Sequence, residues 1–236
     1  MNDFAENYKN ILFDCGLCDY ATDELAARFE TLTALLLEAN QKMNLTAIRE
    51  EKEIILKHYA DCLLASHLLP ENGRLLDVGC GGGFPTLPLA IVRPGLSVTA
   101  VDSTAKKLVF VRDAAKALGL RVETLPGRAE DLGRKPDFRE KFNAVTARAV
   151  AELSVLTEWC LPFVKVGGVF VAMKGASGKE ELEKAKNAIK ILGGSVETVE
   201  ERTLGDAARV NIVVRKNKKT PEAYPRKNTI IQRSPL

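Results

Sequence analysis

The chain has 236 residues, of which 46% are hydrophobic and 28% are charged, and its formal net charge is +3. This composition is ample for a buried core, and no apolar run reaches the roughly 20 residues that a membrane-spanning helix needs. The five cysteines are odd in number and scattered, which does not indicate a disulfide framework. The first residues lack the basic and apolar regions of a signal peptide. We therefore expect a soluble, cytoplasmic protein with no membrane association.

The charge is distributed unevenly along the chain. Residues 1–73 contain six Lys and Arg against thirteen Asp and Glu, and residues 74–214 contain twenty-one against seventeen. Residues 215–236 contain seven basic residues and one acidic residue. A polyanionic partner is therefore expected to bind the second part and the tail, and not the N-terminal part.

Residues 1–73 have the apolar periodicity of helices, and we expect them to form a cap against the rest of the chain. A first helix is predicted to end at Gly16, because glycine suits a helix C-terminus. Thr22 is a candidate N-cap for a longer helix with one apolar stripe, formed by Leu25, Phe29, Leu32 and Leu36. A polar loop is predicted at residues 40–46, and a third helix at about residues 50–69.

Polar residues in this part have both functional and structural interpretations. Cys15 and Cys18 form a CxxC pair, but no second pair is spaced for zinc, so we interpret them as incidental thiols. One face of the third helix carries His58, Asp61 and Cys62. Three such residues without a fourth ligand favour a polar face turned toward a cleft or solvent, and we predict no metal site. Asn44 either lines the mouth of a substrate cleft or makes a turn with its own side chain.

The stretch from Asp77 to Pro85, with the sequence DVGCGGGFP, lies between an apolar strand pattern and an apolar helix pattern. Its glycines allow positive φ and a close approach of the backbone to a ligand. Pro85 is predicted at the first helical position. Phe84 stands where a dinucleotide fingerprint has its third glycine, so the spacing is D-x-G-x-G-x-G around Gly79 and Gly81. This pattern is typical of S-adenosylmethionine (SAM) methyltransferases.

From residue 74 the pattern alternates between strands and helices, which predicts a doubly wound α/β sheet. Strands are expected near residues 74–78, 97–101, 121–125, 143–147, 168–173, 195–202 and 209–215. Helices are expected near residues 85–93, 104–118, 151–164 and 178–192. No helix separates the last two strands, so they should pair antiparallel. We expect a Rossmann-like methyltransferase domain over residues 74–215, with a seven-stranded, mostly parallel sheet and helices on both faces.

Ligand-binding residues are expected where the predicted strands end, because those ends share one edge of the sheet. Asp102 follows Gly83 by nineteen residues and can accept hydrogen bonds from ribose hydroxyls, with Ser103 beside it. After the third strand, a backbone N–H and a carboxylate can bind an adenine edge, at Ala129 and Glu130. The fourth and fifth strands end at Arg148 and Lys174.

No residue is obviously placed as a general base. The fourth strand end reads Ala147-Arg148-Ala149, without the Asn/Asp-Pro-Pro-aromatic motif of enzymes that methylate exocyclic amines. Cys160 lies in an apolar helix pattern and is more consistent with a core residue than with a nucleophile. A ring nitrogen such as N7 of guanine needs positioning and no proton removal. Arg148 at this strand end has two interpretations. It binds the SAM carboxylate or a substrate phosphate, or it is a surface residue paired with Glu152.

Residues 216–236 are predicted to be a basic C-terminal tail. Arg226 and Lys227 follow an aromatic residue, Tyr224, which suits contact with RNA through phosphates and stacking. The alternative is a disordered, solubilising tail.

Several motifs together resemble the bacterial small-subunit ribosomal RNA methyltransferase G family, also called glucose-inhibited division protein B. The resemblance covers nearly the whole chain, and it is most specific in the NLT and GGGFP elements. The segments that carry it are residues 40–48 (NQKMNLTAI), 58–63 (HYADCL), 77–85 (DVGCGGGFP), 101–103 with Lys106 and Lys107, 127–130 (GRAE), 147–149 (ARA) and 224–227 (YPRK). The chain departs from the family pattern at Thr86, Cys80, Cys62 and residues 228–231.

The resemblance implies SAM-dependent methylation of N7 of one guanine in 16S ribosomal RNA. It implies SAM contacts at Gly79, Phe84, Ala129, Glu130 and Arg148. We expect a monomer that acts on this RNA, either free or within a small-subunit particle. Two alternatives remain: a methyltransferase for small molecules or proteins, and a non-catalytic SAM-binding RNA module.

Overall fold

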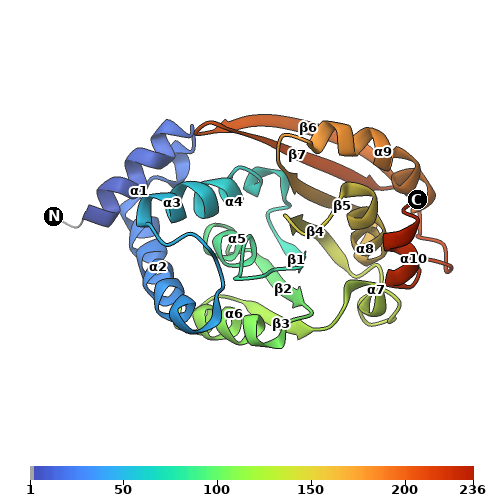
Figure 1. The fold of residues 1–236 in the computed structure, drawn as a ribbon, viewed down its shortest axis with the longest axis horizontal. Helices are drawn as coiled ribbons and strands as arrows, with labels where there is room; N and C mark the ends of the chain where they lie inside the picture. The colour runs from blue at the N-terminus through green and yellow to red at the C-terminus, as the bar shows by residue number, and fades with distance from the viewer. Residues whose placement is uncertain (1–2) are drawn as a thin grey trace.

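The computed structural model describes residues 3–236, which form a seven-stranded sheet covered by helices on both faces (Figure 1). The strand order is β3-β2-β1-β4-β5-β7-β6, and only β7 runs against the others. The predicted antiparallel pairing of the last two strands is therefore confirmed. The strands are β1 (Gly73–Val78), β2 (Leu96–Asp102), β3 (Val122–Pro126), β4 (Phe142–Arg148), β5 (Val164–Lys174), β6 (Gly194–Leu204) and β7 (Ala207–Lys216).

The central strands are apolar because both faces of the sheet are covered. Successive side chains point to opposite faces, so Leu75 packs toward one layer of helices and Leu76 toward the other. The first layer contains α5 (Thr86–Val92) and α6 (Ala105–Ala117). The second contains α7 (Ala129–Leu132), α8 (Leu153–Cys160) and α9 (Gly178–Ile191). The two layers leave the carboxyl ends of the parallel strands open at one edge.

The N-terminal residues fold as helices, as predicted. They form α1 (Asp3–Asp14), α2 (Asp23–Met43), α3 (Glu51–Ile54), a π-helical segment (Ile55–Ala60) and α4 (Asp61–Leu63). Short 3-10 turns lie at Cys18–Tyr20 and Ser66–Leu68. Thr22 caps α2 by accepting a hydrogen bond from the N–H of Leu25, and Gly16 follows α1 with φ +69°. These helices share one hydrophobic core with α5 and α6.

The end of α2 differs from the sequence prediction, which placed a loop at residues 40–46. The helix continues to Met43, and Asn44 then adopts the left-handed conformation with φ 49°. Asn40 remains helical because its side-chain amide hydrogen-bonds both backbone groups of Thr46 in the returning loop. A polar residue that is typical of loops is therefore buried in a helix by a local partner.

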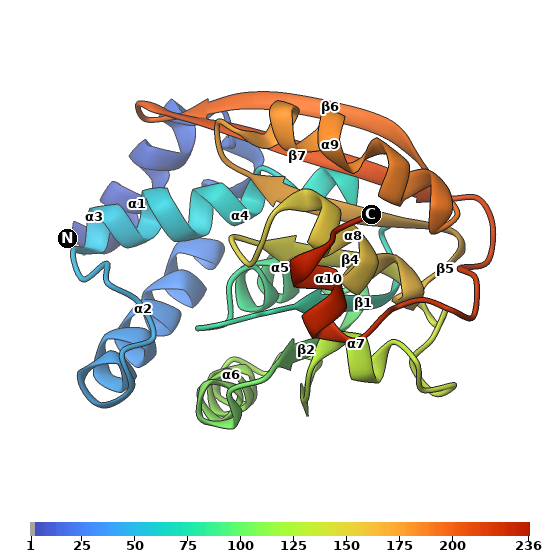
Figure 2. The ribbon, with the colours of Figure 1, turned by 45° about the vertical axis from the view of Figure 1, so that its right-hand side comes forward.

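The C-terminal segment crosses the second helical layer and ends in α10 (Asn228–Arg233), which packs against α8 (Figure 2). Lys216, the first residue of the predicted tail, is the last residue of β7 and is fully buried. The sequence prediction did not include α10 or α7, which are only six and four residues long. The predicted helix at residues 151–164 is shorter, because a 3-10 turn at Leu161–Phe163 leads into β5. None of the helices within residues 3–236 combines the length and the apolar character needed to cross a membrane.

Candidate functional site

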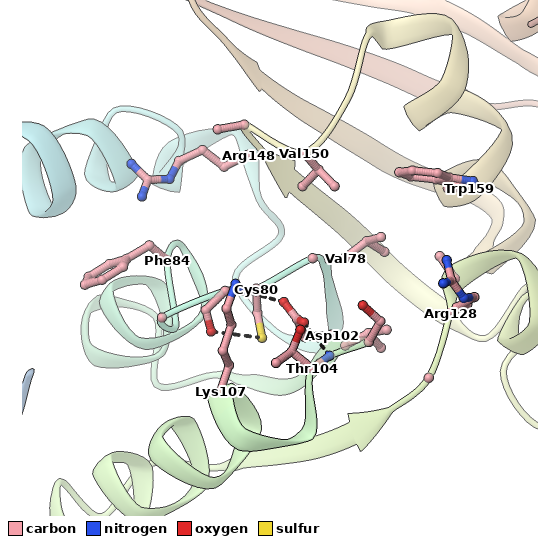
Figure 3. Close-up of a pocket in the computed structure, with 18 of the residues that line it drawn as sticks. Val78, Cys80, Phe84, Asp102, Thr104, Lys107, Arg128, Arg148, Val150 and Trp159 are labelled. Atoms are coloured by element: carbon pink, nitrogen blue, oxygen red, sulfur yellow. Dashed lines mark hydrogen bonds between the residues drawn. The ribbon is translucent and has the colours of Figure 1, made fainter. Parts of the chain in front are cut away.

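A cavity of about 480 Å³ opens at the carboxyl ends of β1 to β4 (Figure 3). Its wall includes the glycine loop, the residues that follow β2, the β3–α7 turn and the end of β4. Eight of the predicted cofactor-binding residues line it: Gly79, Gly81, Phe84, Asp102, Ser103, Ala129, Glu130 and Arg148. The ninth, Asp77, does not. The converging strand ends therefore form one site, as the parallel topology requires.

The glycine loop forms the floor of the cavity. Gly79 and Gly81 have φ of +74° and +55°, which favour glycine over residues with a side chain. A Cβ atom on Gly79 would lie 2.7 Å from a methyl group of Val150, so this position also needs glycine for space. The N–H groups of Gly79 and Cys80 are held by the carbonyl of Val101. The loop is therefore fixed at the end of β2 and presents bare backbone to the cavity.

Asp102 holds this loop by a hydrogen bond and also lines the cavity. One of its carboxylate oxygens accepts the Gly81 N–H at 3.0 Å, and the other accepts the Thr104 N–H at 2.7 Å. Each carboxylate oxygen can accept a second hydrogen bond, so capacity remains for ligand hydroxyl groups. Ser103 is exposed beside it on the cavity wall.

Asp77 lies beneath the loop and is fully buried. Its carboxylate accepts hydrogen bonds from the backbone N–H and the hydroxyl of Thr86 and from the hydroxyl of Thr146. Burial raises its pKa to about 6, and these hydrogen bonds act in the opposite direction. Asp77 accepts a hydrogen bond from the Thr86 N–H, and α5 begins at Thr86. Pro85 was predicted at the first helical position, but it lies one residue before the helix. Asp77 thus ties α5 and β4 to the loop from below.

Arg148 closes one end of the cavity. Its guanidinium donates to a carboxylate oxygen of Asp61 at 2.7 Å, to the carbonyl of Lys57 at 3.2 Å and to Nδ1 of His58 at 3.2 Å. The second oxygen of Asp61 accepts from Arg209 at 2.6 Å. The alternative of a surface pair between Arg148 and Glu152 does not occur. The polar face of the third predicted helix therefore faces the cleft, whereas Cys62 of the same helix is buried in the core.

Phe84 and His58 stack at this end, with ring centroids 4.3 Å apart and an interplanar angle of 10°. The Arg148 guanidinium lies 5.6 Å from the centroid of Phe84. Burial and the Arg148 charge lower the pKa of His58 to about 4. Its Nδ1 accepts from Arg148, so its Nε2–H donates to the Thr46 hydroxyl at 2.8 Å. Both nitrogens are therefore engaged, and neutral His58 is not placed as a general base.

A second cavity of about 760 Å³ adjoins the first and shares three wall residues with it, His58, Arg148 and Ala149. Three basic residues of the remaining wall are Lys57, Lys174 and Arg209. Lys174 is nearly buried, and it donates to the carbonyl of Ala151 at 2.8 Å and pairs with Glu181 at 2.6 Å. The two cavities therefore meet at residues that line both of them.

The opposite end of the first cavity is formed by α7 and the tail. Ala129 and Glu130 are buried there, and burial raises the pKa of Glu130. Trp159 of α8 and Asn228 of α10 complete the wall. Sequence reasoning missed both residues, because no motif or spacing connects them with the glycine loop.

The predicted RNA-binding residues have varied positions. Asn44 lies at the end of α2, one residue from Leu45 on the cavity wall. Arg226 pairs with the buried Glu158, and Lys227 is exposed at the start of α10. Their contacts with RNA, and that of Lys174, remain predictions.

These residues fit SAM as the ligand of the first cavity. A Cβ on Gly81 would meet nothing nearer than the Gly79 carbonyl at 4.0 Å, so this position leaves open space beside the backbone, Asp102 offers acceptors for a ribose, and Arg148 offers a cation for a carboxylate. Two buried polar atoms at the α7 end, Trp159 Nε1 and Asn228 Oδ1, have no partner within residues 3–236. In the same part of the chain, no group of three or more His, Cys, Asp and Glu side chains is arranged to hold a metal ion. The five thiols are free.

Known proteins resemble this chain in fold and in sequence. The structure of TYW2 from M. jannaschii in complex with AdoMet matches with a TM-score of 0.54 at 17% identity, covering 66% of this chain and 74% of that chain. TrmN from Thermus thermophilus matches with a TM-score of 0.52 at 23% identity, covering 66% and 47%. At these identities the matches show the SAM-dependent methyltransferase fold that the sequence predicted.

Sequence comparison is more specific. Ribosomal RNA small subunit methyltransferase G of Pelotomaculum thermopropionicum is 46% identical over 242 residues, which cover all of both chains. The protein of the same name in Staphylococcus carnosus is 49% identical over 220 residues, covering 91% of this chain and 92% of its own. The model of the family described as rRNA small subunit methyltransferase G matches residues 25–210. The chain therefore belongs to the rRNA small subunit methyltransferase G family.

Proposed function

We propose that this chain transfers the methyl group of SAM to N7 of a guanine in 16S ribosomal RNA, the nucleotide being guanine 527 by family resemblance. One observation carries the proposal beyond family membership. The cavity that fits SAM meets a second cavity at Arg148, His58 and Ala149, so a donor and an acceptor can approach each other there.

In the proposed cofactor site, each group has a distinct task. The bare backbone of Gly79 and Gly81 allows close approach, and Asp102 accepts hydrogen bonds from the ribose hydroxyls. Ala129 and Glu130 lie at the adenine end. SAM supplies a methyl group on a positively charged sulfur, which makes that methyl group electrophilic.

Arg148 is the positioning residue between the two cavities. Its guanidinium has five N–H groups, and three acceptors use one each: Lys57 O, Asp61 Oδ2 and His58 Nδ1. The remaining donors can hold the carboxylate of SAM or a phosphate of the substrate. Asp61 and His58 fix the orientation of the guanidinium, so little side-chain entropy is lost when the ligand binds.

The proposed reaction needs no general base. N7 of guanine has a free lone pair, and it attacks a methyl group without first losing a proton. This agrees with His58, whose low pKa and two hydrogen bonds keep it neutral and occupied. Catalysis then depends on holding N7 in line with the methyl group, which a positioned pair of cavities can do.

We propose that the second cavity receives the acceptor nucleotide. Lys57 on its wall has a side chain that is 47% exposed, and it favours an anionic ligand such as the RNA backbone, whereas Arg209 is held by Asp61 at 2.6 Å. Asn44 and Lys227 are proposed to contact RNA outside the cavities. Lys174 and Arg226 already pair with Glu181 and Glu158, so they are proposed to shape the site.

The remaining sequence predictions are part of this proposal. Residues 1–73 act as a helical cap, residues 74–215 as the methyltransferase domain and residues 216–236 as a C-terminal segment. The protein is proposed to act as a monomer in the cytoplasm, on 16S RNA that is free or within a small-subunit particle. The names of the relatives as ribosomal RNA methyltransferases support the substrate.

The experiment combines binding and product mapping. Purified protein is titrated with SAM by calorimetry, then incubated with labelled SAM and small subunits from cells that lack the enzyme, or with 16S RNA stripped from them. We expect binding and one labelled guanine, with no transfer to wild-type RNA. Transfer only to proteins or small molecules would contradict the RNA substrate, and binding without any transfer would indicate a non-catalytic module.

A further inference from the structure

Two residues that line the cofactor cavity each carry a buried polar atom without a hydrogen-bond partner. Among the side chains of residues 3–236, Trp159 Nε1 and Asn228 Oδ1 are the only buried nitrogen or oxygen atoms with no partner. Both residues line the first cavity. A buried donor or acceptor without a partner is costly, so such atoms in a folded protein require an explanation. Here one is a donor and the other an acceptor, which is the set that a heteroaromatic ring edge would satisfy.

The location of these atoms identifies the ligand group. Figure 3 shows Trp159 near Arg128 at one end of the cavity, and Phe84 and Arg148 at the other, with Asp102 between them. If Asp102 binds the ribose and the Arg148 end binds the methionine part, the remaining end must hold the adenine. That end is the one formed by α7, α8 and α10.

The residues on both sides of Asn228 are anchored to the rest of the chain. Arg226, two residues earlier, forms a two-pronged ion pair with Glu158, which is fully buried in α8 next to Trp159. The backbone N–H of Arg226 also donates to Glu158 at 2.7 Å. On the other side, Ile231 of α10 is fully buried. The backbone that carries Asn228 is therefore anchored on both sides.

The part of the C-terminal segment that precedes Arg226 is anchored as well. Arg139 donates to three backbone carbonyls of the C-terminal segment, those of Thr220, Pro221 and Tyr224. The buried ammonium of Lys216 donates to the carbonyl of Leu161 and the hydroxyl of Thr220, both at 2.6 Å. Ordering a terminal segment costs conformational entropy, and these contacts offset that cost. A free RNA-binding arm would not need them.

We infer that the C-terminal segment contributes to cofactor recognition, with Trp159 Nε1 and Asn228 Oδ1 binding one hydrogen-bonding edge of the SAM adenine and leaving the other edge to Ala129 and Glu130. The indole N–H donates to a ring nitrogen, and the side-chain carbonyl of Asn228 accepts from the exocyclic amine. Adenine presents this pair of groups side by side. Hypoxanthine has a carbonyl in place of the amine and would face Asn228 Oδ1 with a second acceptor. The inference rests on the proposed function, because it requires SAM in the first cavity.

The test compares two ligands by calorimetry: S-adenosylhomocysteine and S-inosylhomocysteine, which carries hypoxanthine. The wild type is expected to bind the adenosyl ligand at least about tenfold more tightly, since one buried hydrogen bond is replaced by a repulsive contact. Asn228→Ala should bind it about five- to tenfold more weakly and lose most of the preference. Asn228→Asp keeps an acceptor oxygen and should retain the preference. The exposed neighbour Thr229→Ala serves as the matched control and should behave as the wild type.

Trp159 offers an independent measurement, because it is the only tryptophan in the chain. Its fluorescence should change when S-adenosylhomocysteine binds and stay unchanged with homocysteine, which lacks the adenine. Trp159→Phe keeps an aromatic ring without the N–H and should weaken adenosyl binding about fivefold. Melting temperatures without ligand separate loss of binding from loss of folding.

Three results would overturn the inference. The first is wild-type affinity and preference in both Asn228→Ala and Trp159→Phe. The second is a fluorescence spectrum that does not respond to the adenosyl ligand. The third, no binding of the adenosyl ligand by the wild type, would overturn the proposed function and this inference with it, whereas the first two leave the proposed function intact.

Discussion

The substitution Arg148→Ala tests the link between the two cavities most directly. It removes a side chain that contacts Asp61, Lys57 and His58 and lies over the ring of Phe84. The side chains of Arg148 and Asp61 are only 14% and 11% exposed, so this ion pair is poorly screened by solvent. The substitution therefore affects both stability and activity, and the two effects can be separated.

The loss of stability in Arg148→Ala depends on how well the remaining charge of Asp61 is compensated. Breaking a buried ion pair by removing one partner costs about 3–5 kcal/mol, because the other charge is left uncompensated. Here Asp61 keeps Arg209 at 2.6 Å, so we expect a smaller loss of about 2–3 kcal/mol in the free energy of unfolding. Urea unfolding measures this loss, and the protein should still fold.

The functional cost should be larger. A charge-assisted hydrogen bond to the SAM carboxylate or a substrate phosphate contributes about 1.5–3 kcal/mol, which corresponds to roughly 10- to 150-fold. Misplacing the acceptor adds to this, so we expect kcat/KM for RNA methylation to fall at least about 100-fold. Arg148→Lys should restore little, because a lysine cannot reproduce the planar fork of donors.

Arg209→Ala is the matched control, because it removes the other partner of the same carboxylate. It should cost a similar amount of stability and leave the affinity for SAM unchanged, since Arg209 lines only the second cavity. Near-normal methylation by Arg148→Ala would refute the role of Arg148. Equal loss of SAM affinity in both variants would show that Asp61 pairing, and not the Arg148 guanidinium, supports the cofactor site.

Three further predictions concern the cofactor site and its surroundings. Asp102→Ala should lower SAM affinity at least about tenfold in calorimetry, because a ribose acceptor and two loop hydrogen bonds are lost. Gly79→Ala should abolish SAM binding because of its φ of +74° and the lack of space, whereas Gly175→Ala, which meets open space, should not. The pKa of His58 falls from 6.5 to about 4 on folding, so the unfolded chain binds more protons between these pH values and stability rises with pH there. Urea unfolding of His58→Asn should show a rise in the free energy of unfolding between these pH values that is smaller than that of the wild type by about 3 kcal/mol. Buried Asp77 titrates in the opposite sense in both proteins, so the test compares the wild type with the variant at each pH.

Much of the fold could be predicted because local sequence patterns determine it. The apolar strand runs, the Thr22 cap and the D-x-G-x-G-x-G spacing depend on residues close together in the chain, and the structure has each of them. Asp102 could be predicted as well, because a parallel sheet brings the ends of β1 and β2 to one edge. These inferences need only periodicity and topology.

Partners that are distant in the chain could not be predicted in this way. Arg148 meets Asp61 across 87 residues, and its alternative partner Glu152 was attractive only because it is close in sequence. Trp159 and Asn228 reach the cavity from two separate helices, of which α10 is too short to give a periodic signal. Their role depends on side-chain packing, which composition and spacing do not encode.

The tail shows why sequence charge is a weak guide to binding charge. Seven of the last 22 residues are basic, which favoured an RNA-binding arm. In the structure, the ammonium of Lys216 is buried, and Arg215 and Arg226 pair with Glu197 and Glu158. The exposed basic residues that remain are Lys218, Lys219, Lys227 and Arg233. Lys216, Arg215 and Arg226 therefore attach the C-terminal segment to the sheet domain. The attached segment forms part of the wall of the proposed adenine site.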